Sequence, residues 1–386
     1  MRFLPVLLAC AFLVHHVGGQ TQPEPEPFRA AWVATVFNLN FPSKPGLAVE
    51  TQKTELIQML EAARRSRLNA VVFQVRPESD AVYISSLEPW SRYLTGDQGG
   101  NPAYDPLDFL IQQAKPRGIA VHAWINPYRA AATADKTRAA RNTADRFRRF
   151  CYPIHTMLWL DPGALPVQDH VVAVVRDLIR RYPIAGVHLD DYFYPYPKDP
   201  QHPVAFPDDA VYRAYRESGG TLEKADWRRR NVNQLVARLH SIIRSEAPHM
   251  KFGISPFGIY TPGQPATVTG KLDQLNQLYA DPLQWLRDGT VDYLAPQLYW
   301  PDKSEQSFSE LLKWWRSREV NPRGIPIYPG IAVERLGGSY NWPASEIRRQ
   351  LDLEKKTGPG ANAGFILWNI KPLQENTKGI SDIIRR

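Results

Sequence analysis

Short runs of apolar and β-branched residues alternate along the chain with longer stretches in which apolar residues recur every three or four positions. The short runs are typical of buried parallel strands, because both faces of such strands lie against apolar neighbours. The spacing in the longer stretches puts apolar side chains on one face of a helix. The alternation therefore predicts an α/β protein in which helices cover a parallel sheet.

We predict eight strands, at residues 28–36, 69–76, 119–127, 185–193, 251–259, 291–300, 325–333 and 364–370. The helices predicted between them include residues 54–66, 106–115, 168–182, 226–247, 307–317 and 344–356, and Asp105 is expected to cap the helix that begins at Pro106. Eight strands that alternate with helices favour a (β/α)8 TIM barrel over an open sheet. Long loops after the second, fourth and fifth strands account for the remaining length, so residues 28–386 form one barrel domain without a second domain.

The beginning of the chain differs from the rest. Residues 1–19 combine a single arginine, an apolar run and small residues at Gly18 and Gly19, which is the form of a secretory signal peptide. Residues 20–27 form a proline-rich polar tether. We therefore expect an exported protein, periplasmic or secreted, and a lipoprotein attached through Cys10 of the sequence LLAC is the alternative. No later apolar run is long enough to span a bilayer.

Composition and charge narrow the classes of function. The chain of 386 residues is 43% hydrophobic, which is enough for a large packed core. Cys151 alone would remain after removal of the leader, so we expect no internal disulfide and a structural role for this cysteine. The net charge of +8 arises from arginine-rich stretches typical of solvated helix faces, and with an export signal it predicts attraction to anionic envelope polymers and no nucleic-acid partner.

Polar and aromatic residues collect where the predicted strands end, and in a (β/α)8 barrel the catalytic groups come from these carboxyl ends. We assign substrate binding to Arg76, Glu78, Asp80, His122, Trp124, Asn126, His188, Tyr192, Tyr194, Gln297, Trp300 and Trp368, and catalysis to Asp190, Asp191 and Tyr299. Arg129 and Asn369 also lie at strand ends but are assigned no role. Aromatic rings stack on sugar faces, while carboxylates bind hydroxyls or protonate a glycosidic oxygen. The combination indicates a glycoside as substrate.

Four segments resemble a known protein family. Residues 28–42 (FRAAWVATVFNLNFP), 71–91 (VVFQVRPESDAVYISSLEPWS), 106–129 (PLDFLIQQAKPRGIAVHAWINPYR) and 186–195 (GVHLDDYFYP) are similar to family ten of the bacterial glycosyl-hydrolase-like proteins. The resemblance extends over about residues 28–368 and implies a (β/α)8 barrel of the bacterial cell envelope. It also implies a candidate substrate, because a member of this family acts on denuded peptidoglycan, the glycan strands from which the stem peptides have been removed. Many members are lipoproteins. The fold alone does not fix the substrate, because one barrel hosts many chemistries.

The adjacent carboxyls of Asp190 and Asp191 suggest a mechanism. The 2-acetamido oxygen of an N-acetylated amino sugar can attack the anomeric carbon in place of an enzyme nucleophile. One carboxylate then holds the acetamido N–H while another protonates the leaving oxygen, and the sequence LDDY is similar to the paired aspartates of some hexosaminidase-type barrels. We expect Asp190 to orient the acetamido group and Asp191 to act as general acid and base, with the reverse assignment open. Tyr299 would donate a hydrogen bond to the intermediate.

A two-carboxylate mechanism is the competing enzymatic scheme. In that scheme a carboxylate of the fourth strand is the nucleophile, and Glu78, Asp80 or Glu334 supplies the second carboxyl. The substrate would then be a different extracellular polysaccharide. A third possibility is a non-catalytic glycan-binding barrel, but both aspartates are present, and burying two neighbouring carboxyls without a use for them costs stability.

The histidines and Arg76 have more than one interpretation. His122 and His188 lie within predicted strands, so they either form a polar layer that orients the aspartates or bind a metal with them. The chain lacks the close ligand spacing of a catalytic zinc site, so we expect no metal, no cofactor and no metal-dependent deacetylase. We expect His122 to hydrogen-bond a carboxylate or a sugar hydroxyl, and Arg76 to pair with Asp80 or Asp190.

Overall fold

The computed structural model describes residues 26–134, 136–140, 142–358 and 363–385. The predicted leader, Cys10 and residues 20–25 of the predicted tether lie outside these residues. Within the described part of the chain, no helix is both long enough and apolar enough to cross a membrane.

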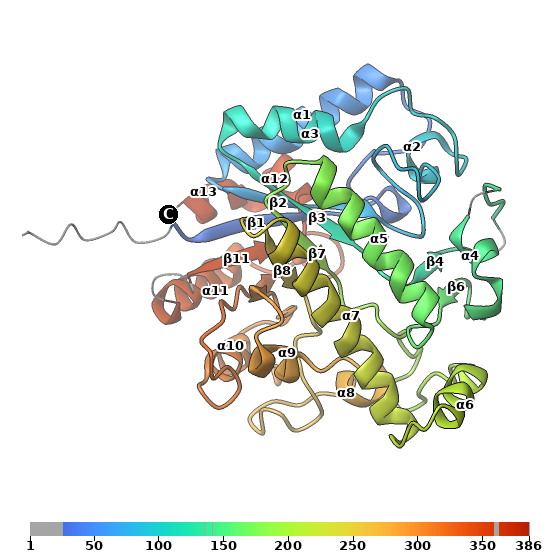
Figure 1. The fold of residues 1–386 in the computed structure, drawn as a ribbon. Coiled ribbons are helices and arrows are strands. Elements are labelled where there is room, and N and C mark those ends of the chain that lie inside the picture. The colour runs from blue at the N-terminus through green and yellow to red at the C-terminus, as the bar shows by residue number, and fades with distance from the viewer. Residues whose placement is uncertain (1–25, 135, 141, 359–362, 386) are drawn as a thin grey trace, which may run out of the picture.

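Eight parallel strands form the central sheet (Figure 1). In spatial order they are β10 (Gly330–Ile331), β11 (Gly364–Leu367), β1 (Phe28–Val33), β2 (Ala70–Arg76), β3 (Ala120–Ile125), β7 (Gly186–Leu189), β8 (Lys251–Ile254) and β9 (Tyr293–Leu294). Parallel bridges from Leu294 to Ile327 and from Gln297 to Gly330 join β9 to the segment around β10, so the ring of strands closes. The predicted (β/α)8 barrel is confirmed.

Two of the strands are much shorter than the sequence predicts. The predicted strands at 291–300 and 325–333 contain only two regular strand residues each, in β9 and β10. Pro296, Pro326 and Pro329 interrupt the ladder here, because proline has no N–H to donate. Their carbonyl groups still accept hydrogen bonds from the N–H groups of Gly330, Leu294 and Ile366 respectively. Isolated contacts therefore replace regular pairing where the barrel closes.

The helices lie around the barrel. Six occupy the predicted positions: α1 (Val49–Arg65), α3 (Pro106–Ala114), α5 (Leu165–Arg181), α7 (Lys224–Glu246), α10 (Phe308–Arg316) and α11 (Ala344–Thr357). The others are α2 (Arg92–Thr95), α4 (Thr143–Arg146), α6 (Asp209–Glu217), α8 (Gln274–Gln277), α9 (Pro282–Asp288), α12 (Lys371–Gln374) and α13 (Ile380–Arg385), with 3-10 turns η1 (Val36–Asn38), η2 (Lys115–Arg117), η3 (Arg148–Phe150), η4 (Val333–Leu336) and η6 (Thr377–Gly379). The predicted cap of α3 is confirmed, because the Asp105 carboxylate accepts a hydrogen bond of 3.0 Å from the backbone N–H of Asp108.

A small antiparallel sheet follows β3 and was not predicted. It consists of β4 (Arg129–Ala131), β5 (Cys151–Ile154) and β6 (Met157–Leu160), in the order β4-β6-β5. The sheet lies in residues 126–164, so β3 is also followed by a long loop, in addition to the long loops predicted after the second, fourth and fifth strands. Burial raises the pKa of the Cys151 thiol to about 12, as suits an unreactive cysteine.

The core has two parts. The larger part lies between the sheet and the helices. The smaller part fills the inside of the barrel with small and aromatic side chains, namely Ala30, Trp32, Ala34, Ala70, Val72, Trp124, Tyr293, Ala295 and Ile366. The barrel is therefore packed rather than hollow.

Candidate active site

Asp190 and Asp191 directly follow β7, which ends at Leu189. They are only 4% and 2% exposed. The backbone N–H of Phe193 donates to the carbonyl of Asp191 over 2.9 Å, so the chain turns at the pair. Because the strand has ended, the two side chains are not forced onto opposite faces of the sheet. This is the local geometry that a joint role for the two carboxyls requires.

Asp190 is held by several donors. Trp124 Nε1 donates to Oδ2 over 3.1 Å, Asn126 Nδ2 donates to both oxygens over 3.0 and 3.2 Å, and the Tyr192 N–H donates to Oδ1 over 3.3 Å. Burial raises the pKa of Asp190, and the Arg129 charge and these donors oppose that rise. The donors fix the orientation of this carboxylate and favour its ionised form.

Asp191 has a different environment. Its carboxylate accepts hydrogen bonds from the Tyr196 hydroxyl and from the Gln297 side chain. Burial, and next the charge of Asp190, raise the pKa of Asp191 to about 7. A carboxyl with such a pKa can give up a proton and take one back near neutral pH.

Arg129 and Tyr196 have a larger part in the site than the sequence indicated. The Arg129 guanidinium donates to the Pro77 carbonyl over 3.0 and 2.8 Å and lies 5.1 Å from the centre of the Tyr192 ring. In the sequence, Arg129 follows the predicted third strand, and Tyr196 belongs to the run YFYPYP at residues 192–197. That aromatic run directly after the aspartates was the available signal for Tyr196.

The predicted aromatic side chains meet next to the aspartates. The Tyr299 ring stacks on Trp368 with ring centres 6.4 Å apart, and Trp368 meets Trp124 edge-on at 6.1 Å. Burial, and then the charges of Glu334 and Asp191, raise the pKa of Tyr299 well above its usual value. The Tyr299 hydroxyl therefore keeps its proton and can act as a hydrogen-bond donor.

Glu334 is a further carboxyl at this end of the barrel. It lies in η4, and its backbone N–H donates to the Trp368 carbonyl over 3.1 Å. Burial raises the pKa of Glu334 to about 7, and its buried Oε2 has no hydrogen-bond partner among the described residues. This arrangement keeps Glu334 available as a second carboxyl.

Trp300 lies farther out. Its ring meets Phe257 edge-on at 5.6 Å, and Phe257 in turn lies 6.4 Å from the ring of Tyr196. Since Tyr196 contacts Asp191, a row of aromatic rings connects Trp300 with the catalytic candidates.

Glu78 and Asp80 are buried and turn towards the segment around α2. Tyr93 donates to Glu78 over 2.6 Å, and Gln98 donates to Asp80 over 3.3 Å. Burial, and next the charge of Glu78, raise the pKa of Asp80 to about 7. Arg129 connects this pair with Asp190: its guanidinium donates to the carbonyl of Pro77, the residue before Glu78, and its charge opposes the rise in the pKa of Asp190.

Arg76 has a different partner from the two that we predicted. Its guanidinium donates to Glu88 over 2.8 and 2.5 Å, and His170 Nε2 lies 2.9 Å from the same carboxylate. Burial alone would raise the pKa of Glu88, but Arg76 and His170 outweigh it and lower that pKa to about 2. The predicted pairing with Asp80 or Asp190 is wrong, because Glu88 reaches Arg76 from the loop after β2.

His122 and His188 form a polar layer deeper in the barrel. The Nδ1 atoms of His122 and His188 lie 3.1 and 3.0 Å from the Tyr293 hydroxyl, and Trp32 Nε1 donates to His188 Nε2 over 3.2 Å. Burial lowers the pKa of His122 to about 4 and that of His188 well below its usual value, so both rings are neutral at pH 7. The expected hydrogen bond from His122 to a carboxylate is replaced by the one with Tyr293. Among the described residues, no three His, Cys, Asp or Glu side chains are grouped so that they could hold a metal ion.

Tyr194 is not brought to the aspartates. Its buried ring contacts Phe206 at 5.1 Å and Tyr279 at 4.9 Å, and the Arg228 guanidinium lies 5.5 Å from the ring centre. The turn at Asp191 directs Tyr192 and Tyr196 to the site and Tyr194 away from it.

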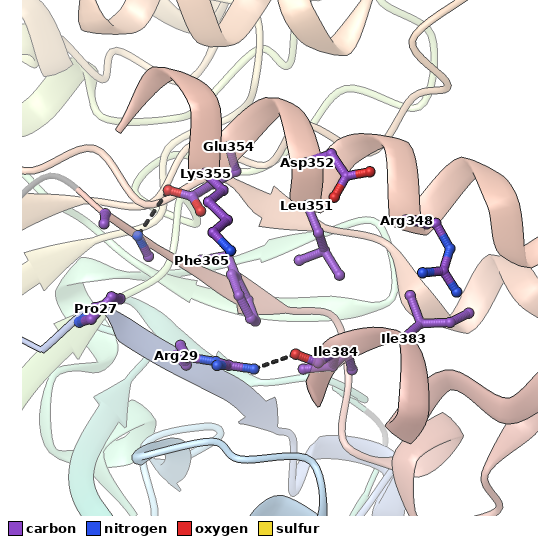
Figure 2. A pocket seen from close by; sticks show the side chains of 12 residues that line it. Pro27, Arg29, Arg348, Leu351, Asp352, Glu354, Lys355, Phe365, Ile383 and Ile384 are labelled. Atoms are coloured by element: carbon purple, nitrogen blue, oxygen red, sulfur yellow. Dashed lines mark hydrogen bonds between the residues drawn. The ribbon is translucent and has the colours of Figure 1, made fainter. Parts of the chain in front are cut away.

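A cavity at the opposite end of the barrel offers a contrast (Figure 2). It has a volume of about 190 Å³ and lies where β1 and β11 begin, next to α11 and α13. Figure 2 shows Phe365 and Leu351 beside charged groups, including a hydrogen bond from Arg29 to the Ile384 carbonyl. Because catalytic groups of such barrels lie where the strands end, this cavity is not the candidate active site.

Comparison with known proteins agrees with the fold and the chemistry. A family model described as "Glycosyl hydrolase-like 10" matches residues 27–344. The glycosyl hydrolase YngK of Bacillus subtilis (strain 168) is 35% identical over 401 aligned residues, covering 99% of this chain and 76% of YngK. The glycosyl hydrolase DigH of Escherichia coli (strain K12) is 35% identical over 362 residues, covering 86% of this chain and 81% of DigH.

Solved structures are similar in fold. The glycoside hydrolase domain of PgaB (BpsB) from Bordetella bronchiseptica superimposes with a TM-score of 0.59 at 12% sequence identity, over 93% of this chain and 99% of that domain. At this identity the likeness concerns the barrel fold alone.

Proposed function

The chain belongs to the glycosyl hydrolase-like 10 family and is a glycoside hydrolase, and we propose that it cleaves N-acetylated amino-sugar glycans, with denuded peptidoglycan strands as its substrate. Such a substrate lies outside the cytoplasm, in agreement with the signal peptide that the sequence predicts. Two findings support the proposal: membership of the family and the chemistry of the carboxyl groups at the strand ends.

The observation that carries the proposal is the unequal environment of two adjacent buried carboxyls. Asp190 receives hydrogen bonds from Trp124, Asn126 and a backbone N–H and lies near the charge of Arg129. Asp191 has a pKa raised to about 7 by burial and by the charge of Asp190. Burial raises the pKa of both carboxyls, but the donors and the Arg129 charge oppose that rise at Asp190, whereas the charge of Asp190 adds to it at Asp191. This difference assigns the ionised role to Asp190 and the acid role to Asp191 in the proposal.

This division supports distinct roles in substrate-assisted hydrolysis. The ionised Asp190 accepts a hydrogen bond from the acetamido N–H, so the acetamido oxygen is oriented and attacks the anomeric carbon. Asp191 gives its proton to the glycosidic oxygen as that bond breaks, and the leaving sugar departs with a new hydroxyl. Asp191 then removes a proton from the water that opens the cyclic intermediate, which restores the acid and the acetamido group. Tyr299, which keeps its proton, donates a hydrogen bond to the intermediate.

The aromatic side chains beside the aspartates suit the sugar rings. Trp368 and Tyr299 are half-buried and stack on each other at the end of the barrel, beside Trp124. Flat rings at such a place can pack against the apolar face of a pyranose.

Glu334 favours a second scheme. Its raised pKa and its unpartnered Oε2 suit an acid that works with a strand-four carboxylate as nucleophile. In that case the substrate need not carry an acetamido group, so another extracellular polysaccharide would be cleaved.

Product analysis tests the two schemes. Residues 20–386 would be incubated with peptide-free peptidoglycan glycan and with chitin oligosaccharides, with and without a thiazoline inhibitor that imitates the cyclic intermediate. We expect cleavage by the unmodified protein, inhibition by the thiazoline, and loss of cleavage in both Asp190→Asn and Asp191→Asn. Glu334→Gln is the matched control and should keep activity.

The outcomes are distinct. Cleavage that survives in either aspartate variant removes that residue from the mechanism. Loss of cleavage in Glu334→Gln, without thiazoline inhibition of the unmodified protein, would establish the two-carboxylate scheme. Binding of the glycan without any cleavage would instead indicate a glycan-binding barrel.

A further inference from the structure

A second cavity lies beside the helices that follow the small antiparallel sheet. It has a volume of about 650 Å³ and is bounded by the first residues of α5, by α6, by the beginning of α7 and by the residues around η3. In Figure 1, α5 and α7 run side by side and α6 lies next to the beginning of α7. We name it the α5–α7 cavity.

The lining of the α5–α7 cavity is basic. Its residues include no Asp or Glu, but they include the exposed Arg149 and Arg230. Neither arginine forms an ion pair with any residue that the structure describes. The Arg230 guanidinium lies 5.6 Å from the centre of the Tyr215 ring. A cavity with two unneutralised guanidinium groups and no acidic side chain favours an anionic ligand.

Polar and aromatic groups complete the lining. Asn231 is only 4% exposed, and its Nδ2 has no hydrogen-bond partner within the described part of the chain. Gln168 and Gln234 add further amide groups, and Tyr215 adds a half-buried aromatic ring. Amides, an aromatic ring and positive charge together suit a sugar that carries a carboxylate.

The α5–α7 cavity is connected to the candidate active site through β6. Trp159 of β6 donates to the Phe193 carbonyl over 3.1 Å, and its ring lies 6.2 Å from that of Tyr192. Four residues further along the chain, Gly163 lines the cavity. Since four residues span at most about 14 Å, the cavity lies on the same side of the barrel as the aspartates.

We infer that the α5–α7 cavity binds a carboxylate-bearing sugar of the same glycan strand whose glycosidic bond lies at Asp190 and Asp191. The inference rests on the proposed function. Removal of the stem peptides leaves a free lactyl carboxylate on every second sugar of a peptidoglycan strand, whereas chitin has no such group. Arg149 and Arg230 would bind that carboxylate, so the cavity would distinguish denuded strands from neutral amino-sugar polymers.

Calorimetric titration tests this inference. The Asp191→Asn variant, which preserves the ligand, would be titrated with a denuded peptidoglycan octasaccharide and with the same octasaccharide after methyl esterification of its lactyl groups. We expect the free acid to bind more tightly than the ester. Adding Arg149→Gln and Arg230→Gln should weaken binding of the acid about tenfold or more and leave binding of the ester nearly unchanged.

Two further variants serve as controls. Arg213→Gln removes one positive charge from an exposed position of α6 that does not line the cavity, and binding of both ligands should stay unchanged. Ala214→Trp fills the cavity without removing a charge and should also abolish the preference for the acid.

Equal binding of acid and ester, or an unchanged preference in the double arginine variant, would overturn the inference. The proposed function would then still stand if the unmodified protein cleaves the glycan. Conversely, absence of cleavage together with arginine-dependent binding of the acid would refute the proposed function, and only the binding of a carboxylate-bearing sugar in the cavity would remain.

Discussion

Two buried carboxyl clusters lie on loops at the same end of the barrel and behave in opposite ways. Glu88 is paired with Arg76 and His170, and its pKa is lowered to about 2. Asp191 is equally buried, but its partners are a hydroxyl group and an amide, and its pKa is raised to about 7. Burial raises both pKa values, so the difference comes from the neighbouring charges: cations beside Glu88 and the Asp190 carboxylate beside Asp191.

The comparison separates a carboxyl that cations hold in its charged form from one whose pKa is raised. A buried carboxylate with a guanidinium partner is stable in its charged form and holds a loop in place. A buried carboxyl beside a second carboxyl destabilises the protein at neutral pH, and in the proposed mechanism Asp191 uses its raised pKa for proton transfer. Burial alone therefore does not identify an active site.

The largest expected change in stability comes from removing the charge of Glu88. In Glu88→Gln the buried Arg76 guanidinium loses its counter-charge, and we expect the free energy of unfolding at pH 7 to fall by about 3–5 kcal/mol. Because the folded pKa of Glu88 lies below its usual value of 4.5, its contribution is present above about pH 4.5 and is lost as the pH falls towards 2. Urea unfolding of both proteins between pH 3 and 7 measures this difference.

A matched control uses an exposed ion pair. Asp145→Asn breaks the ion pair between Arg138 and Asp145, whose side chains are 26% and 53% exposed, and should cost less than about 1 kcal/mol. A similarly small effect in Glu88→Gln would show that the Arg76 pair contributes little to stability, and the comparison between the two clusters would fail.

The second prediction concerns the cluster of Asp190 and Asp191. Asp191→Asn should raise the free energy of unfolding by about 1–4 kcal/mol at pH 8 while it abolishes cleavage. The folded pKa of about 7 lies above the ordinary value of 3.8, so ionisation of Asp191 destabilises the folded wild type as the pH rises from about 4 to 7. The gain of the variant should thus be absent near pH 3, grow between these values and stay constant above pH 7.

Unfolding curves of the two proteins at pH 3, 5 and 8 check this sign. A variant that is less stable than the wild type at pH 8 would mean that the Asp191 carboxylate is stabilised in the fold, as Glu88 is. Asp191 would then be a structural group, and the acid would have to be sought elsewhere.

The same two clusters show which parts of the site can be predicted from the sequence alone. The strand-end rule located Asp190, Asp191, Trp124 and Asn126, because position along a barrel strand decides which end a residue faces. It could not provide the partner of Arg76, since Glu88 comes from a loop and His170 from α5. Partners distant in the chain leave no local pattern.

The histidines and the small sheet show two other limits. The sequence places His122 and His188 within strands and allows a polar layer, but it does not tell how deep in the barrel they lie. In the structure both contact Tyr293 rather than the carboxylates. The strands β4, β5 and β6 are three or four residues long, which is too short for an alternation to stand out.

The smallest expected effect is a shift in the pH dependence of cleavage. If Asp191 is the general acid, kcat should decline as the pH rises through about 7, because the protonated form is lost. Burial gives Glu334 a pKa of about 7 as well, so the position of the decline does not by itself identify the acid.

The Glu334→Gln variant distinguishes the two carboxyls, because it removes the titration of Glu334 and leaves Asp191 between Tyr196 and Gln297. We expect the descending limb of Glu334→Gln to stay within about half a pH unit of the wild type, because Glu334 is not among the main causes of the raised pKa of Asp191. A descending limb that disappears in Glu334→Gln would assign the acid to Glu334, and Asp191 would then be the nucleophile or a positioning group of the two-carboxylate scheme.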